Sequence, residues 1–261
     1  MKDFMYDNQY ASDYQLMICS FEKSSGATTV DMGSQFENNQ IKIVGTDEFI
    51  NINNDYSTPS PFPFQVCKIT NDYTADEITS YEFSNINRWL NRKESHRFKI
   101  DKDNYEDIYF VGRFNIKAIK IKDIIYGLEL TFVSDFPYGF SDEITETFTG
   151  KDFSVYNYSD EIGILLPTIK ITCKEEGDLI IRNSMDNEIF KLTECKNGEN
   201  IIIDSKNMII QSSDLSHKVY DCFNYNYIKL CNTYTERENK FNSTLNIDME
   251  IKYSPVRKVG I

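Results

Sequence analysis

The fold class is decided by the stretch Leu245-Asn246-Ile247-Asp248-Met249-Glu250-Ile251-Lys252-Tyr253. Every odd-numbered residue in it is apolar and every even-numbered residue is polar, which is the pattern of a strand with one face on a core and the other in water. The same alternation occurs at residues 128–132 and 169–173, and runs at 108–121 and 178–181 also indicate strands. The sequence therefore predicts a mainly β protein with a minor helical part.

Turn-forming residues separate these runs. Asn197-Gly198 lies between apolar runs at residues 190–192 and 201–203, and because glycine tolerates a positive φ the pair predicts a hairpin that joins the two runs. Glu176-Gly177-Asp178 and Asp101-Lys102-Asp103-Asn104 indicate further turns between strands.

One amphipathic helix is predicted in the first half of the chain. Ile86, Trp89 and Leu90 fall at i, i+3 and i+4, which places them on one apolar stripe. Ser84 is placed to cap the N-terminus, and the cations of Arg92-Lys93 suit the C-terminal end of the helix dipole. Trp89 is the only tryptophan in the chain. Its place on the apolar stripe predicts a core anchor.

The breakers in Phe136-Pro137-Tyr138-Gly139 indicate a domain boundary near residues 136–146. Before this stretch the chain mixes a helix with strands, and after it the pattern is almost purely β, apart from a short helix indicated at residues 214–219. We therefore divide the chain into domains 1–140 and 141–261.

The stretch Thr58-Pro59-Ser60-Pro61-Phe62-Pro63 is expected to be extended, because each proline fixes its own φ and disfavours helix in the residue before it. The favoured interpretation is a rigid lead-in to a strand at residues 64–69. The alternative is a polyproline-type ligand for another protein.

The charge of the chain argues against nucleic-acid binding. The sequence has 28 Lys and Arg against 41 Asp and Glu, a formal net charge of -13, whereas proteins that neutralise phosphates show the opposite balance. Residues 1–7 lack the apolar segment of a signal peptide, and no apolar run is long enough to span a bilayer. We expect a protein made in the cytoplasm of its host cell, without membrane contact.

Motifs of catalysis and cofactor binding are missing from the sequence: it contains no nucleophile elbow, P-loop, dinucleotide fingerprint or zinc-protease motif. Asp101-x-Asp103 begins like a calcium loop but lacks the required glycine, so a solvated turn is favoured. His217 has no nucleophile beside it in the sequence, and a surface or capping role is favoured over that of a general base. We predict no catalytic, cofactor-binding or metal-binding residues and a protein that is not an enzyme.

The cysteines form no CxxC pair, and neither His96 nor His217 lies beside one of them. Each is predicted to be a small buried hydrophobe rather than a metal ligand or half of a disulfide. The six are Cys19, Cys67, Cys173, Cys195, Cys222 and Cys231.

A short basic cluster accompanies the predicted helix: Arg88, Arg92, Lys93 and Arg97. On a continuous helix Arg88 and Arg92 would share one face. The first interpretation is a solvated face that meets the carboxylates of a partner protein, and contact with DNA is the second.

The order of these segments resembles the phage distal tail proteins, also called the siphovirus tail component family. The resemblance covers nearly the whole chain and rests on order rather than on a single motif. The first domain carries it in Ser12-Asp13-Tyr14-Gln15-Leu16-Met17-Ile18, Arg88-Trp89-Leu90-Asn91-Arg92-Lys93, Tyr105-Glu106-Asp107-Ile108-Tyr109-Phe110-Val111-Gly112 and Gly127-Leu128-Glu129-Leu130-Thr131-Phe132. The second carries it in Asp160-Glu161-Ile162-Gly163, Gly177-Asp178-Leu179-Ile180-Ile181, Gly198-Glu199-Asn200-Ile201 and the C-terminal Tyr253-Ser254-Pro255-Val256-Arg257-Lys258-Val259-Gly260. Two departures are Gln15, where the family commonly has glycine, and residues 44–49, where many members are glycine-rich.

The resemblance implies a tail-tube-like sandwich or barrel with one helix in domain 1–140 and a galectin-like β-sandwich in domain 141–261. It implies a homohexameric ring at the tail tip or baseplate of a phage or phage-tail-like particle. The ring would connect the tail tube protein to the tail-associated hub protein and scaffold the adsorption apparatus, including receptor-binding proteins. DNA would pass through its channel without stable binding.

Two other classes of function compete with this one. A carbohydrate-binding module for host cell-wall glycans would need exposed aromatic rings, and Tyr220, Phe223, Tyr225 and Tyr227 are the candidates, although their burial in the sandwich is favoured. A cell-wall hydrolase is disfavoured because the sequence lacks its motifs.

Overall fold

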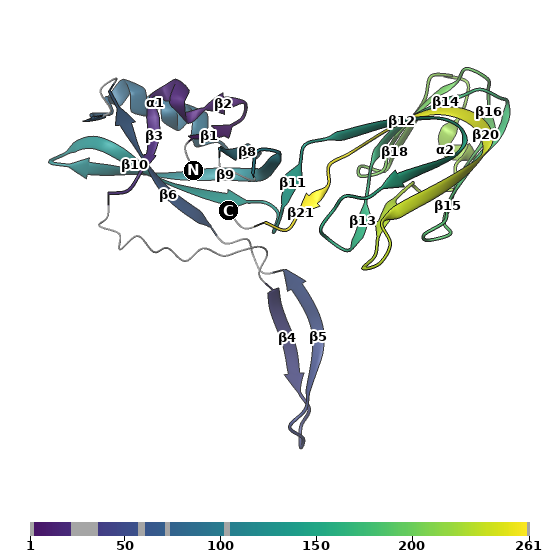
Figure 1. Ribbon diagram of the computed structural model, residues 1–261, viewed down its shortest axis with the longest axis horizontal. Helices are drawn as coiled ribbons and strands as arrows, with labels where there is room; N and C mark the ends of the chain where they lie inside the picture. The colour runs from purple at the N-terminus through teal and green to yellow at the C-terminus, as the bar shows by residue number, and fades with distance from the viewer. Residues whose placement is uncertain (1–2, 22–35, 57–60, 71–73, 102–104, 260–261) are drawn as a thin grey trace. The chain divides into compact units, whose positions relative to one another are not determined.

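The structure, a computed structural model, describes residues 3–21, 36–56, 61–70, 74–101 and 105–259 (Figure 1). The chain divides into two compact units: unit 1 comprises Met1–Phe140 and Arg257–Ile261, and unit 2 comprises Ser141–Val256. The division falls inside the stretch 136–146. It differs from the expected domain 141–261 at the C-terminus, because Val259 packs against the core of unit 1.

Unit 1 is built on an antiparallel sheet whose main path runs β2-β1-β8-β9-β10-β6-β3. Two short strands lie off this path beside β6 and β9, and β11 also pairs with the C-terminal strand β21. The elements are β1 (Asp3–Tyr6), β2 (Gln9–Tyr10), the 3-10 helix η1 (Ala11–Tyr14), β3 (Leu16–Cys19), β6 (Phe62–Ile69), β7 (Ala75–Asp76), α1 (Ser80–Leu90), β8 (His96–Asp101), β9 (Ile108–Ile121), β10 (Ile124–Ser134), β11 (Gly139–Ser141) and β21 (Val256–Arg257). A separate hairpin joins β4 (Phe36–Lys42) to β5 (Phe49–Tyr56).

The strands of unit 1 follow the expected alternation. β9 occupies the whole of the predicted run at 108–121, and Leu128, Leu130 and Phe132 of β10 are buried. Pro63 lies within β6 opposite Thr131, which confirms an extended backbone there. Residues 57–60 of the proline-rich stretch and residues 102–104 of the expected turn and calcium-like loop lie outside the described residues.

Helix α1 begins earlier and ends earlier than predicted. Its N-cap is Thr79, which receives a hydrogen bond from the backbone N–H of Glu82 at 3.3 Å, while the Glu82 carboxylate accepts one from the backbone N–H of Thr79 at 2.9 Å. This reciprocal capping box satisfies the first free amides, so Ser84 lies inside the helix and the predicted cap is wrong. At the other end Asn91 leaves helical geometry, with φ -87° and ψ 78°, ahead of the two cations expected there.

Trp89 is the core anchor that the sequence predicts. Its side chain is 2% exposed, and its indole N–H donates to the backbone carbonyl of Tyr6 at 2.9 Å. The indole is stacked on Tyr14 at 4.5 Å between ring centroids and on Phe4 at 5.8 Å, with interplanar angles of 5° and 7°. Trp89 therefore fastens α1 to β1 and to η1.

Unit 2 is a β-sandwich made from one curled sheet of order β16-β15-β20-β14-β17-β18, with β12 on the other edge of β20 (Figure 1). The two halves of the sheet share a single apolar core. The elements are β12 (Ile144–Tyr156), β13 (Gly163–Leu165), β14 (Thr168–Cys173), β15 (Gly177–Asn183), β16 (Ile189–Cys195), β17 (Asn200–Asp204), β18 (Ile209–Ser212), α2 (Val219–Cys222), β19 (Leu230–Asn232) and β20 (Glu238–Tyr253).

Strand β20 produces the curl because it changes partner along its length. Residues 247–252 pair with β14 and residues 241–243 pair with β15, while β12 follows β20 on its other edge. At the changeover the register with β12 shifts between Gly150 and Asp152, and Gly150 has a φ of +121°, which favours glycine. The alternating stretch at 245–253 thus lies at the centre of the unit with its odd-numbered residues buried.

The predicted hairpin between residues 190–192 and 201–203 is wrong, although the turn is present. Gly198 has a φ of +80°, and its N–H donates to the carbonyl of Cys173 at 2.7 Å. β16 pairs with β15 and β17 pairs with β14, so the turn carries the chain between the two halves of the sheet. Turn chemistry sets where a chain reverses, whereas the partner of each strand is set by the core. The helix expected at residues 214–219 is also displaced, since the structure has only the short α2 at Val219–Cys222.

Truncation of Trp89 should destabilise unit 1. Trp89→Ala removes a buried indole, two ring contacts and a hydrogen bond, so we expect it to lower the free energy of unfolding by about 3–5 kcal/mol. Urea denaturation followed by circular dichroism measures the change. The matched control is Tyr81→Ala on the same helix, whose side chain is 77% exposed. A midpoint for Trp89→Ala equal to that of the control would contradict the anchoring role.

Candidate functional site

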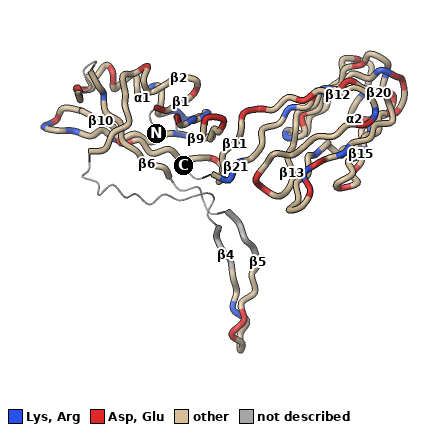
Figure 2. The backbone as a smooth tube through the Cα atoms, in the orientation of Figure 1, with Lys and Arg blue, Asp and Glu red and all other residues tan. Residues whose placement is uncertain are grey.

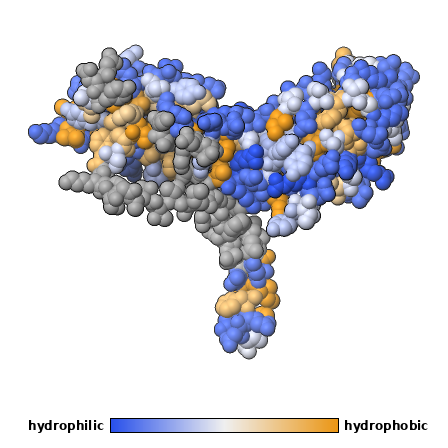
Figure 3. Space-filling model, in the orientation of Figure 1, coloured by the Kyte–Doolittle hydropathy of each residue, from blue (hydrophilic) through white to orange (hydrophobic). Residues whose placement is uncertain are grey.

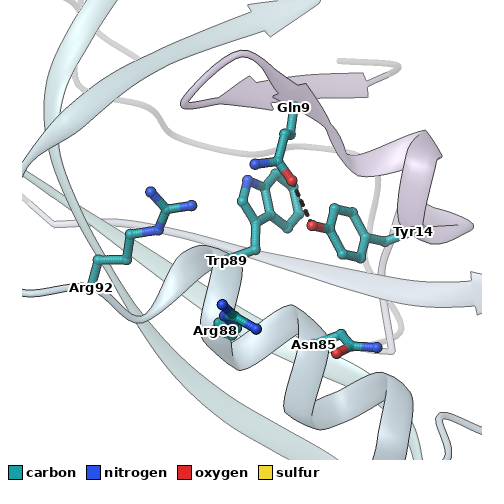
Figure 4. Close-up of a pocket in the computed structure, with 6 residues that line it drawn as sticks. All are labelled: Gln9, Tyr14, Asn85, Arg88, Trp89 and Arg92. Atoms are coloured by element: carbon teal, nitrogen blue, oxygen red, sulfur yellow. Dashed lines mark hydrogen bonds between the residues drawn. The ribbon is translucent and has the colours of Figure 1, made fainter.

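A polar pocket opens beside the C-terminal half of α1 (Figure 4). It is lined by Gln9, Tyr14, Asn85, Arg88, Trp89 and Arg92 and has a volume of about 650 Å³. α1 contributes Asn85, Arg88 and Trp89 to it, and the segment of β2 and η1 contributes Gln9 and Tyr14. The packing of Trp89 against Tyr14 brings these two segments together.

The two arginines of the pocket have different surroundings. The Arg92 guanidinium donates to Asp7 at 2.6 Å, and the other carboxylate oxygen of Asp7 lies 3.3 Å from Nδ1 of His96. Arg88 is exposed and forms no ion pair with any residue that the structure describes. On the far wall the Tyr14 hydroxyl donates to the Gln9 side-chain oxygen at 2.6 Å, which leaves the Gln9 amide group as a donor.

The structure divides the basic cluster that the sequence predicts. Arg88 and Arg92 line one pocket, but they are not on one helix face, because α1 ends at Leu90. Arg97 lies in β8 with its guanidinium 4.4 Å from the ring centroid of Tyr109. In the view of Figure 2, Lys and Arg are interspersed with Asp and Glu in both units, so the basic character is local to the pocket.

The β4–β5 hairpin is the second unusual surface. Ile41, Val44, Phe49, Ile50 and Ile52 are each more than half exposed on it, and Val44 is 98% exposed. The hydrophobic surface of this hairpin is visible in Figure 3. Single exposed apolar residues are common on proteins, but a contiguous set of large ones marks an interaction surface.

The register of the hairpin brings these side chains together. Ile41 pairs with Ile50 across the two strands, and Ile52 follows Ile50 by two residues. Beside them Lys42 lies 5.9 Å from the ring centroid of Phe49 and 3.5 Å from a carboxylate oxygen of Asp47. The apolar side chains Ile41, Phe49, Ile50 and Ile52 of the hairpin are therefore left largely exposed.

A buried polar cluster in unit 2 contains His217. The side chains of His217 and Glu199 are 2% and 1% exposed, and Nδ1 of His217 lies 2.6 Å from Oε1 of Glu199. Ser212 donates to the same oxygen, and the backbone N–H of Lys196 donates to Oε2 at 2.8 Å. The surface role expected for His217 is wrong, because its side chain is buried against Glu199. The two residues are eighteen positions apart in the sequence, so only the fold brings them together.

This cluster lacks the arrangement of a nucleophilic site. A Ser–His–Glu triad places the imidazole between the hydroxyl and the carboxylate. In this cluster both Ser212 and His217 bond to Glu199, so the imidazole cannot take the serine proton through that contact. Burial alone would raise the pKa of Glu199, but the hydrogen bonds from Ser212, His217 and the Lys196 backbone lower the pKa below its usual value. The cluster holds the β17 and β18 ends together.

The cysteines are free thiols, and four of the six are buried as predicted, whereas Cys19 and Cys222 are half-buried. Burial, followed by the contact with Cys67, raises the pKa of the Cys19 thiol to about 12, and burial raises that of Cys231 to about 12. Among the described residues no group of three or more His, Cys, Asp and Glu side chains is arranged to hold a metal ion. In the same part of the chain no helix is long and apolar enough to cross a membrane.

The four candidate aromatic residues of unit 2 divide between core and surface. Phe223 is buried, as expected, but Tyr220 is exposed and Tyr225 is 66% exposed, so the expectation of burial is wrong for these two. The Tyr225 ring packs 5.6 Å from Phe223, and its hydroxyl donates to the backbone carbonyl of Tyr220 at 2.9 Å. Tyr227 is half-buried and donates to the carbonyl of Met208 at 2.6 Å.

Comparison with known families identifies the family to which the chain belongs. A family model described as a phage tail protein N-terminal domain matches residues 1–136, and one described as a phage tail C-terminal domain matches residues 138–253. The chain belongs to this family of phage tail proteins. A comparison by sequence with curated proteins finds no match.

A solved structure shares the fold of this phage tail protein. The crystal structure of the Dit protein (gp 19.1) of phage SPP1 aligns with a TM-score of 0.68 and 13% identity, over 98% of this chain and 99% of that chain. The SPP1 protein is described as a paradigm of the hub adsorption apparatus in phages that infect Gram-positive hosts. At this identity the likeness is one of fold. It confirms the resemblance to distal tail proteins and the mainly β fold.

The buried Glu199 should make the stability of this phage tail protein depend on pH. Because its pKa is lowered in the folded state, the carboxylate stabilises the fold above the ordinary Glu pKa of about 4.3, and this contribution is lost as the pH falls through the lower folded value. Glu199→Gln should lower the free energy of unfolding by about 1.5–3 kcal/mol at pH 7. The difference in the free energy of unfolding between Glu199→Gln and wild type, the stability gap, should narrow as the pH is lowered below about 4.

Denaturant titrations from pH 7 to the lowest pH at which both proteins fold measure this gap. The matched control is Glu143→Gln, which changes an exposed carboxylate of the same unit. A gap for Glu199→Gln that stays constant with pH would contradict the assignment.

Proposed function

We propose that this chain is a structural subunit of the tail tip that forms a homohexameric ring between the tail tube protein and the tail hub protein. The membership in a phage tail family and the fold shared with SPP1 Dit support a structural role in the tail. The uncovered apolar side chains of the β4–β5 hairpin carry the proposal of a ring.

The hairpin needs a covering surface. A two-stranded hairpin by itself is only marginally stable in water, and burial of apolar area contributes about 25 cal/mol per Å². Within the described residues β4 and β5 pair only with each other. A second copy of the chain would cover Ile41, Ile50 and Ile52 of the first copy. The hairpin of the second copy would in turn pack against a third copy.

Such a contact joins two different surfaces, head to tail, and a head-to-tail contact closes into a ring when the rotation between copies divides a full turn. The resemblance to distal tail proteins implies six copies. The net charge of -13 suits a channel wall that repels the DNA phosphates and lets DNA pass without binding. The two faces of the ring would meet the tail tube and the hub, and receptor-binding proteins would attach to its outside.

The hairpin should be required for the ring but not for the fold. Native mass spectrometry of the wild-type protein, alone at high concentration or with its hub protein, should show a hexamer. In Ile41→Ser/Ile50→Ser the ring should be lost while the circular dichroism spectrum of the monomer is kept, because both side chains are already exposed in the single chain. The matched control is Leu215→Ser in unit 2, which removes an apolar side chain that is 99% exposed. A wild-type protein that stays monomeric with its tail partners would contradict the ring, and a hexamer of the double variant would contradict the role of the hairpin.

We also propose that the protein is not an enzyme. The polar cluster of Glu199, Ser212 and His217 is buried and lacks a triad arrangement, and this supports a structural role for it. A zymogram on Gram-positive cell walls with the purified protein should show no clearing, beside lysozyme as the positive control. Reproducible clearing that a single carboxylate substitution abolishes would contradict the proposal.

A further inference from the structure

We propose that the pocket beside α1 binds the carboxylate side chain of an acidic segment in another tail protein. The pocket is lined by Gln9, Tyr14, Asn85, Arg88, Trp89 and Arg92. It lies on α1 and the segment of β2 and η1, apart from the β4–β5 hairpin on which the proposal of a ring rests. The two proposals therefore stand or fall separately.

The first argument is an uncompensated cation in an acidic protein. The chain has thirteen more acidic than basic residues, yet Arg88 has no carboxylate partner among the described residues. The guanidinium of its neighbour Arg92 already forms an ion pair with the Asp7 carboxylate, with 2.6 Å between nitrogen and oxygen. Arg88 thus offers a planar guanidinium with free donors, and this geometry matches a carboxylate through two parallel hydrogen bonds.

The second argument is that the walls around this cation are rigid and rich in donors. Figure 4 shows the six side chains gathered around Trp89, whose ring is fixed by stacking on Tyr14 and Phe4. The hydrogen bond from Tyr14 fixes Gln9, and the amide groups of Gln9 and Asn85 can donate to a bound oxygen. A site in which the side chains are held in place loses little conformational entropy when it binds.

The third argument separates a protein carboxylate from a nucleic acid. Proteins that bind single-stranded nucleic acid stack the bases on aromatic rings. Both faces of the Trp89 ring are covered, by Tyr14 and by Phe4, and only 2% of the residue is exposed. The acidic charge of the whole chain also opposes the approach of a long polyanion, whereas a short acidic segment carries few charges and meets less repulsion.

Trp89 supplies the reporter for the experiment, since it is the only tryptophan and lines the pocket. Its fluorescence is measured while the full-length protein is titrated with the peptide acetyl-Glu-Glu-Glu-amide. Three parallel titrations use acetyl-Gln-Gln-Gln-amide, sodium phosphate and a thymidine oligonucleotide of equal charge to the acidic peptide. We expect a saturable change with the glutamate peptide, no change with the glutamine peptide, and weaker binding of phosphate and oligonucleotide.

Two variants should move the affinity in opposite directions. Arg88→Gln should weaken binding of the glutamate peptide about fivefold, which is the range of one solvent-exposed ion pair. Asp7→Asn should strengthen it, because it removes the internal carboxylate that occupies Arg92. The matched control Arg182→Gln removes an exposed arginine of unit 2 and should leave the affinity unchanged.

Circular dichroism shows whether each variant folds. Equal affinities for wild type, Arg88→Gln and Arg182→Gln would overturn the proposal, as would the lack of a saturable change with the glutamate peptide. Tighter binding of the oligonucleotide than of the peptide would also overturn it and would make the pocket a phosphate site.

Discussion

The structure of unit 2 depends on one constraint: strand β20 must bury every second side chain while both of its edges are hydrogen-bonded. β12 lies on one edge, and β14 and β15 share the other. β14 and β15 pair with different parts of that edge, so the sheet divides there into two halves. The register shift opposite Gly150 lets β20 bend, and the two halves of the sheet close on each other around Ile169, Ile181 and Ile247. The sandwich therefore follows from the burial of one face of a long strand.

In unit 1 an aromatic cluster has the corresponding role. Trp89 joins the helix to the sheet through a hydrogen bond to Tyr6 and through stacking on Phe4 and Tyr14. The same packing brings β2 and η1 against the C-terminal turn of α1, and this creates the pocket that Arg88 and Arg92 line. A core interaction thus determines a surface feature, because the indole that stabilises the unit is also the floor of the pocket.

In contrast to the aromatic cluster around Trp89, the β4–β5 hairpin leaves its apolar side chains exposed. Its isoleucines follow the strand pattern, but within the described residues no third strand or helix covers them. In unit 2, by contrast, even the buried carboxylate of Glu199 is hydrogen-bonded by Ser212, His217 and the backbone of Lys196. The exposed apolar side chains of this hairpin are the observation on which the proposed assembly into a ring rests.

The sequence by itself determined the features that depend on local periodicity: the strands at 108–121 and 245–253, the helix around Trp89 and the change of character near residues 136–146. These could be predicted because side chains two or four residues apart share a face whatever the rest of the chain does. Only the tertiary structure decided which strands pair across the turn at Gly198, and it alone joined Glu199 to His217 and Arg92 to Asp7. Those contacts join segments distant in sequence, and alternation along a strand carries no information about which distant strand will cover its buried face.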